Sequence, residues 1–286
     1  MAGITAAAVK SLRDKTGLPM MECKKALTET GGDEEAAIQA LRERGEKLLG
    51  KRADRATDFG RIGVYADIES GVGAMVEFKC ESASVQQLEE FIELTDDLAK
   101  VLATGSGAAN GEELLAQAST IKDGQTLGTI KDEMFNRIRE VFNIGRMVRV
   151  AGACGGYSHN SSTVAGVLLE VEGGNNEAAK DISMHVAAMN PSALVVEDLD
   201  ADEVAKEKGI LTEAARSEGK PEPIIEKMVE GRMRSYYAQT VLLEQPFVKD
   251  DKMTVRKHAE AHGMKVNKFH HWVLGDDQPA GEAAAE

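Results

Sequence analysis

Apolar positions in the first fifty residues recur at spacings of three and four, as on one face of a helix. Thr5 and Asp33 stand where N-caps belong, and Gly17 stands where a helix ends. The pattern predicts three short helices around one core. The inward positions are Ala8, Val9, Leu12, Met20, Cys23, Leu27, Ala37, Ile38 and Leu41. We therefore expect a helical module over 1–50 and a polar, basic linker over 51–60.

The apolar period changes to two after this linker. Residues 61–68 and 72–80 alternate apolar and other side chains around the turn "ESG", which is typical of a β-hairpin. Helical spacing follows from about 84 to 103 and again around 126–142. The first of these helices is expected to bury Leu88, Phe91, Leu94 or Thr95, Leu98 and Leu102. We expect a first core subdomain over 61–142.

The same arrangement then recurs. Strands are predicted at 146–154 and 163–173, joined by a loop rich in Gly, Ser and Asn at 155–162, and a helix follows over 175–189. This predicts a second, similar subdomain over 143–199. The fold class is therefore α+β, with two similar hairpin-plus-helix core subdomains.

The last part of the chain is again helical. Two helices are predicted in 200–240, separated near 219–223, and a short helix and a final strand follow. We expect a helical C-terminal module over 200–275 that returns to the core. The small, acidic segment 276–286 is expected to be a disordered tail.

Composition narrows the classes of ligand. The net charge is −14, which argues against a nucleic acid as the main ligand, because phosphate binding needs dense Lys and Arg. Three widely spaced cysteines fit reduced thiols. The sequence has no apolar run of about 18 residues and no signal-peptide pattern at its start, so we expect a cytoplasmic protein without a membrane segment. A protein partner or a small ligand is favoured.

Candidate reactive groups are few. Cys80 follows an apolar strand and precedes Glu81, so it is either a nucleophile or a small residue that closes the strand; the adjacent anion disfavours a thiolate. His258 and His262 lie four apart, but no Glu directly follows the first His, as a zinc protease needs. We predict no enzyme, no metal site and no cofactor. His159, in the predicted loop, is a candidate contact residue.

A specific motif in the first module consists of Thr16, Gly17, Met20, Met21, Glu22, Cys23, Lys24, Lys25, Ala26 and Leu27. Through this motif, the stretch 4–42 closely resembles the start of the translation elongation factor Ts family. The segments 184–191 and 219–248 resemble later parts of the same family, in the same order. The resemblance implies a ubiquitin-associated-like (UBA-like) first module. It also implies guanine-nucleotide exchange on elongation factor Tu, with release of GDP and magnesium and without covalent chemistry.

The resemblance also implies contacts with that partner. In the first module these are Lys10, Arg13, Met20 and Met21, together with Val9 and Leu12, although Val9, Leu12 and Met20 could instead form the module's own core. His159 matches a histidine placed near the partner's nucleotide site. Val141 matches an apolar contact there, and the segment 231–248 matches a contact with a more distant partner domain.

The sequence departs from the family after Cys80. The family typically continues with Thr, Asp, Phe and Val, and its Asp and Phe push between two partner helices. Here the tip of that strand reads Ser82, Ala83, Ser84 and Val85, without the acid or the aromatic ring. A Thr-Asp-Phe run does occur at 57–59, but it lies in the predicted linker and is interpreted as coincidence. Two alternatives to exchange stay open: a partner stabiliser with weak exchange, and a thiol or metal enzyme.

Overall fold

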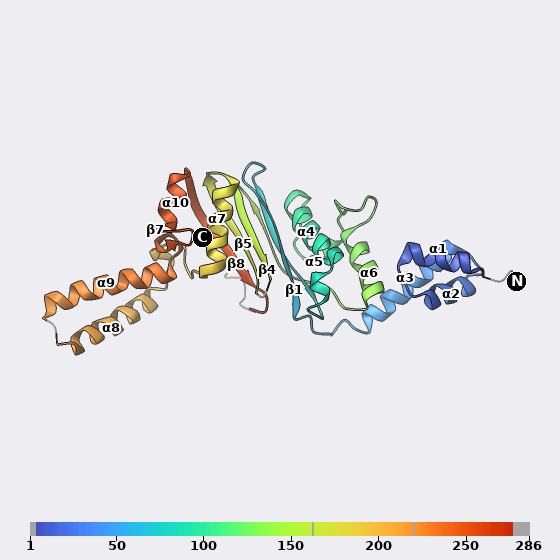
Figure 1. The fold of residues 1–286 in the computed structure, drawn as a ribbon, viewed down its shortest axis with the longest axis horizontal. Helices are drawn as coiled ribbons and strands as arrows, with labels where there is room; N and C mark the ends of the chain where they lie inside the picture. Colours follow the sequence, from blue (N-terminus) through green and yellow to red (C-terminus); the bar gives the residue numbers. More distant parts are fainter. Residues whose placement is uncertain (1–3, 162, 220, 277–286) are drawn as a thin grey trace.

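The protein is described by a computed structural model that covers residues 4–161, 163–219 and 221–276. The predicted tail beyond Asp276 lies outside the described residues. The chain forms an elongated molecule, with the N-terminal helices at one end, the sheets in the middle and a helical hairpin at the other end (Figure 1). Within the described ranges, none of the helices has the length and hydropathy required to span a bilayer.

The N-terminal module has the three predicted helices, α1 (Ala6–Thr16), α2 (Met20–Glu29) and α3 (Glu34–Gly50). Both predicted caps are confirmed: the Thr5 side chain accepts from the Ala8 amide, and Asp33 accepts from the Ala36 amide. Val9, Leu12, Cys23 and Leu27 are buried in the core of the module. Met20 is 49% exposed, so its prediction as an inward residue is wrong.

The first sheet has the strand order β1 (Phe59–Asp67), β2 (Val72–Cys80), β3 (Asn143–Ala151), all antiparallel. Its outer face is covered by α4 (Glu89–Thr104), α5 (Gly111–Leu115) and α6 (Leu127–Ile138). The predicted hairpin is confirmed, but β1 begins at Phe59, inside the predicted linker. A short 3-10 helix, η1 (Val85–Gln87), precedes α4, and Leu88, predicted to be inward, is 40% exposed.

The second sheet has the order β4 (Cys154–Asn160), β5 (Val164–Gly173), β8 (Met264–Val273). Its outer face carries α7 (Asn176–Met189) and α10 (Val255–Ala261). The prediction that 146–154 pairs with 163–173 is wrong, because β3 pairs with β2 in the first sheet. The predicted loop 155–162 is instead mostly strand β4, which forms the hairpin with β5.

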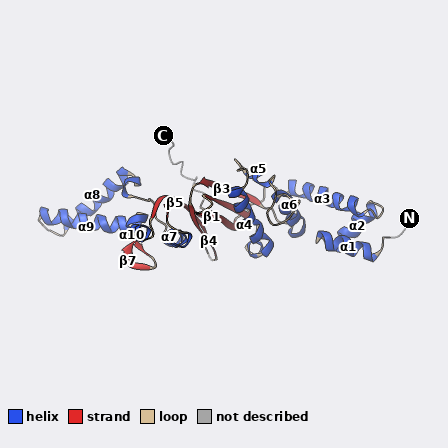
Figure 2. Cartoon of the chain, turned by 90° about the horizontal axis from the view of Figure 1, so that it is seen from above, coloured by secondary structure: helices blue, strands red, loops and turns tan. Residues whose placement is uncertain are grey.

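The two sheets pack face to face, so the core has four layers, helix, sheet, sheet, helix (Figures 1 and 2). Glycine makes this close packing possible. A Cβ atom on Gly156 would lie 2.5 Å from a Val64 methyl carbon, and one on Gly166 would lie 2.3 Å from an Ile62 methyl carbon. Any larger side chain at these two positions would push the sheets apart.

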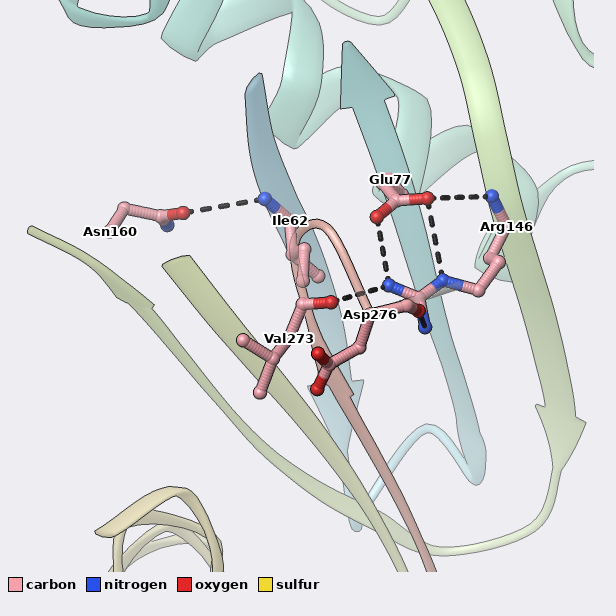
Figure 3. Close-up of polar contacts among 6 residues, drawn as sticks. All are labelled: Ile62, Glu77, Arg146, Asn160, Val273 and Asp276. Carbon is pink, nitrogen blue, oxygen red and sulfur yellow. Dashed lines mark hydrogen bonds and ion pairs between the residues drawn. The ribbon is translucent and has the colours of Figure 1, made fainter. Parts of the chain in front are cut away.

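A buried ion pair links the two sheets. Arg146 of β3 donates to Glu77 of β2, with 2.8 Å between Nη2 and Oε1, and the same nitrogen donates to the Val273 carbonyl of β8 at 2.8 Å (Figure 3). The guanidinium also lies over the Trp272 ring, 5.1 Å from its centroid. Glu77 is 4% exposed, so this carboxylate depends on Arg146 for its charge compensation.

The C-terminal part begins with η2 (Val196–Asp198) and the antiparallel pair α8 (Ala201–Ser217) and α9 (Glu222–Thr240), as predicted. This pair forms the helical hairpin that projects from the sheets (Figure 2). The chain then returns to the second sheet, as predicted. It does so through η3 (Leu242–Glu244), β6 (Pro246–Phe247) and β7 (Asp250–Thr254), before α10 and β8.

Three histidines in the second sheet and the helices packed on it indicate that the stability of the protein depends on pH. His185 is buried; its Nδ1 accepts from the Val248 amide at 3.1 Å, so its Nε2 donates to Gln245 at 2.8 Å. Burial lowers the pKa of His185, and also the pKa values of His258 and His271. The unfolded chain therefore binds more protons than the folded chain once the pH drops below about 6.5.

We expect the free energy of unfolding to fall as the pH is lowered from 7.5 to 5, by up to about 1.4 kcal/mol per pH unit for each proton taken up. Urea denaturation at several pH values measures this. The His185→Gln variant, which cannot titrate, is expected to show a shallower dependence. A free energy that stays constant over this range would contradict the assignment.

Candidate partner-binding site

The Cys80 thiol is not a nucleophile in this fold. It is fully buried, and its Sγ donates to the Ser82 carbonyl at 3.3 Å. Burial raises the pKa of Cys80 to about 12, and the charge of Glu140 adds to this effect. The thiol is therefore protonated at neutral pH and unreactive. The interpretation of Cys80 as a small residue that closes the strand is confirmed.

The tip, Ser82 to Val85, begins two residues after Cys80, and hydrogen bonds hold its first residue in place. Glu140 accepts from the Ser82 amide at 3.1 Å and from the Ser82 hydroxyl at 2.6 Å. In return, Glu81 accepts from the Val141 amide at 2.8 Å and pairs with Arg55 at 2.9 Å. These bonds fix the backbone at the start of the tip.

Only two side chains of the tip are exposed. Ala83 and Ser84 face solvent, whereas Ser82 is half-buried and Val85 is 5% exposed and packs into the first core. Val141, a predicted partner contact, is 2% exposed and belongs to the same core. The structure thus gives Val85 and Val141 a supporting position behind the tip.

His159 lies at the end of strand β4, not in a loop as predicted. Its ring is half-buried, with Nδ1 3.0 Å from the Tyr157 hydroxyl and Nε2 2.8 Å from the Ser161 hydroxyl. The next residue, Asn160, accepts from the Ile62 amide at 3.3 Å and so fastens the end of β4 to β1 (Figure 3). His159 is therefore held in one orientation close to the start of β1.

These features meet at one end of the core, which we call the tip edge: the edge where β1 begins at Phe59, β2 ends at Cys80 and β4 ends at Asn160. Phe59 is the register partner of Cys80. The Ile62–Asn160 bond places the end of β4 three residues further along β1. Two residues that the sequence interpretation missed, Phe59 and the bracing Glu140, belong to this edge.

The N-terminal module presents the other predicted contacts. Lys10 and Arg13 are exposed on α1, and Met20 and Met21 are 49% and 72% exposed at the start of α2. Glu22, the next residue, pairs with Arg139 at 2.6 Å. Because Arg139 directly precedes Glu140, the start of α2 is tied to the loop that braces the tip.

Reactive or ligating clusters are not found in the described ranges. No group of three or more His, Cys, Asp or Glu residues there could hold a metal ion. The His258 ring stacks on Phe247 with 4.1 Å between centroids and lies 4.6 Å from the His262 ring, which is a packing arrangement. The exposed features of this part of the chain are instead the fixed tip and the apolar and basic side chains of the N-terminal module.

Comparisons with known proteins specify the family. The family model described as Elongation factor TS matches residues 84–276. Elongation factor Ts of Methylococcus capsulatus is 41% identical over 276 residues, which cover 96% of this chain and 92% of that protein. Elongation factor Ts of Kineococcus radiotolerans is 40% identical over 280 residues, which cover 96% of this chain and all of that protein. The chain therefore belongs to the elongation factor Ts family of translation elongation factors.

Proposed function

We propose that this protein is a guanine-nucleotide exchange factor for elongation factor Tu. It binds the GDP form of that partner, promotes release of GDP and Mg²⁺, and dissociates when GTP binds. The observation that carries the proposal is the relationship to elongation factor Ts over nearly the whole chain, which includes the module, the core and the helical C-terminal part. It works in the cytoplasm, without a cofactor, a membrane or direct contact with nucleic acid.

The physical basis of exchange is a coupling free energy. If this protein weakens the binding of GDP to the partner by a certain factor, GDP weakens the binding of this protein to the partner by the same factor. The necessary energy comes from contacts that are better in the complex with the nucleotide-free partner. No covalent step is needed, so the protein is not an enzyme in the usual sense. The protonated thiol of Cys80 agrees with this.

The proposed contact residues divide into two groups. Lys10, Arg13, Met20 and Met21 belong to the module, and all four are exposed. Ser82, Ala83, Ser84 and His159 belong to the tip edge, where Val85 and Val141 support the backbone from behind. The segment 231–248, from the second half of α9 to just beyond β6, contacts a more distant domain of the partner.

Release of fluorescently labelled GDP from elongation factor Tu tests the proposal. We expect micromolar amounts of this protein to accelerate release above the unassisted rate, and to weaken the equilibrium affinity of the partner for GDP by about 5- to 150-fold, the usual range of such couplings. No acceleration would refute exchange. A second candidate, a stabiliser that binds the partner with weak exchange, is favoured by the small side chains of Ala83 and Ser84. It predicts a stable complex in which GDP leaves at its unassisted rate.

A further inference from the structure

Phe59 has an unusual position for a phenylalanine. It is 40% exposed, and in the described part of the chain it is the one aromatic residue among the large exposed apolar side chains. Aromatic side chains that are exposed in the free protein are a common source of binding energy at protein interfaces. The interpretation of Phe59 as a linker residue is wrong, because it is the first residue of β1.

The backbone around Phe59 is fixed on both sides. Thr57 is 8% exposed and accepts from the Asn143 side chain at 3.3 Å. The Gly60 amide donates to the Gln86 side chain at 3.1 Å. Gly60 also lies so close to β2 that a Cβ atom there would be 2.2 Å from the Phe78 carbonyl oxygen. The Phe59 ring is therefore exposed on a rigid support, which lowers the entropy lost on binding.

Phe59 lies next to the tip, on the neighbouring strand. Phe59 is paired with Cys80, two residues before Ser82. Its strand also contacts η1, the turn that follows the tip, and the Arg61 guanidinium donates to the Gln86 carbonyl in that turn at 3.3 Å. Leu88, at the end of the same turn, is another exposed apolar residue. The tip supplies only Ala83 and Ser84 to solvent, so the larger apolar surface at this edge comes from its neighbours.

We propose that Phe59 is the apolar anchor of the tip edge: its ring enters an apolar pocket of the partner GTPase. This inference rests on the proposed function and identifies a contact residue on the strand next to the tip. The tip alone exposes small side chains, which bury little apolar area. This proposal requires the pocket to be better formed in the nucleotide-free partner, so that burying the Phe59 ring stabilises that state and promotes exchange.

The test measures labelled GDP release from elongation factor Tu with the full chain and its Phe59→Ala variant. We expect the variant to accelerate release at least about tenfold less than the unmodified protein at equal, subsaturating concentration. The Phe59→Leu variant, which keeps apolar volume, is expected to lie in between. Because the ring is exposed, both variants are expected to keep the thermal midpoint of the unmodified protein.

Ile121→Ala is the matched control. Ile121 is 46% exposed and lines a surface pocket together with Tyr65. Tyr65 is six residues after Phe59 in β1, which corresponds to about 20 Å along the strand, so Ile121 lies away from the tip edge. This variant is expected to exchange normally. If Phe59→Ala also exchanges within twofold of the unmodified protein, the anchor is refuted and the proposed function stands.

A second readout separates the two proposals completely. If the unmodified protein binds the partner without accelerating release, exchange is refuted. The affinities of the variants for the partner, measured by calorimetry, then still test whether Phe59 is an anchor. A tenfold weaker affinity of Phe59→Ala than of Ile121→Ala would then support it, and equal affinities would refute it. If the unmodified protein neither binds nor exchanges, both proposals fail.

Discussion

The Arg146→Met variant is expected to lower the free energy of unfolding by about 3–5 kcal/mol. It removes the donor that Glu77 shares with the Val273 carbonyl, and it leaves a carboxylate that is 4% exposed without a counter-charge. It also removes the guanidinium that lies over Trp272. Urea denaturation followed by the fluorescence of this single tryptophan measures the effect where the two sheets meet.

Two further variants separate the charge from the packing. The double variant Glu77→Met with Arg146→Met keeps apolar volume and leaves no buried charge, so it is expected to be more stable than Arg146→Met alone. Arg234→Met removes a pair with Glu230 on the exposed surface of α9, and is expected to cause no measurable change. If Arg234→Met lowered the free energy of unfolding as much as Arg146→Met, the claim that the loss is large because Glu77 is buried would be wrong.

Local signals predicted most of the helices. The caps at Thr5 and Asp33 use a side chain that bonds to an amide three residues later, so a short stretch of sequence contains the whole interaction. The same holds for α7, which begins after the cap Asn175, inside the predicted span. Met20 was assigned to the wrong side, because helical spacing alone cannot distinguish a core residue from an exposed apolar contact.

Strand partners could not be predicted in the same way. Residues 143–151 have the pattern of a strand, but the pattern does not say whether β3 joins the strand before it or the strand after it. The Glu77–Arg146 pair joins residues 69 apart, and β8 completes a sheet whose other strands lie about 100 residues earlier. Such pairings depend on the packing of the whole core.

The predictions at both strands of the tip edge are wrong, for different reasons. Gly155 and Gly156 indicated a loop before His159, whereas the polar and basic composition of 51–60 indicated a linker around Phe59. In the structure, Gly60, Gly155 and Gly156 lie in strands where another part of the chain approaches too closely for a Cβ atom. Glycine there marks close packing, and this is why the relation of Phe59 to the tip became visible only in three dimensions.

The Ser84→Phe variant tests whether the tip and Phe59 offer the same kind of contact. Ser84 is exposed, so an aromatic ring there can be accommodated. If one pocket of the partner accepts one ring from the tip edge, Ser84→Phe is expected to change the exchange rate by less than about twofold in the unmodified protein. In the Phe59→Ala background the same change is expected to recover most of the lost acceleration, a gain of about fivefold or more.

This design is a double-mutant cycle, and its interaction energy is the informative quantity. Equal gains from Ser84→Phe in both backgrounds would mean that the two positions act independently, and that the tip contacts a different part of the partner. Unequal gains would mean that Phe59 and the tip compete for one site. Ser84→Leu is the control for apolar volume. A smaller recovery with Ser84→Leu than with Ser84→Phe would show that the pocket selects an aromatic ring and not merely an apolar side chain.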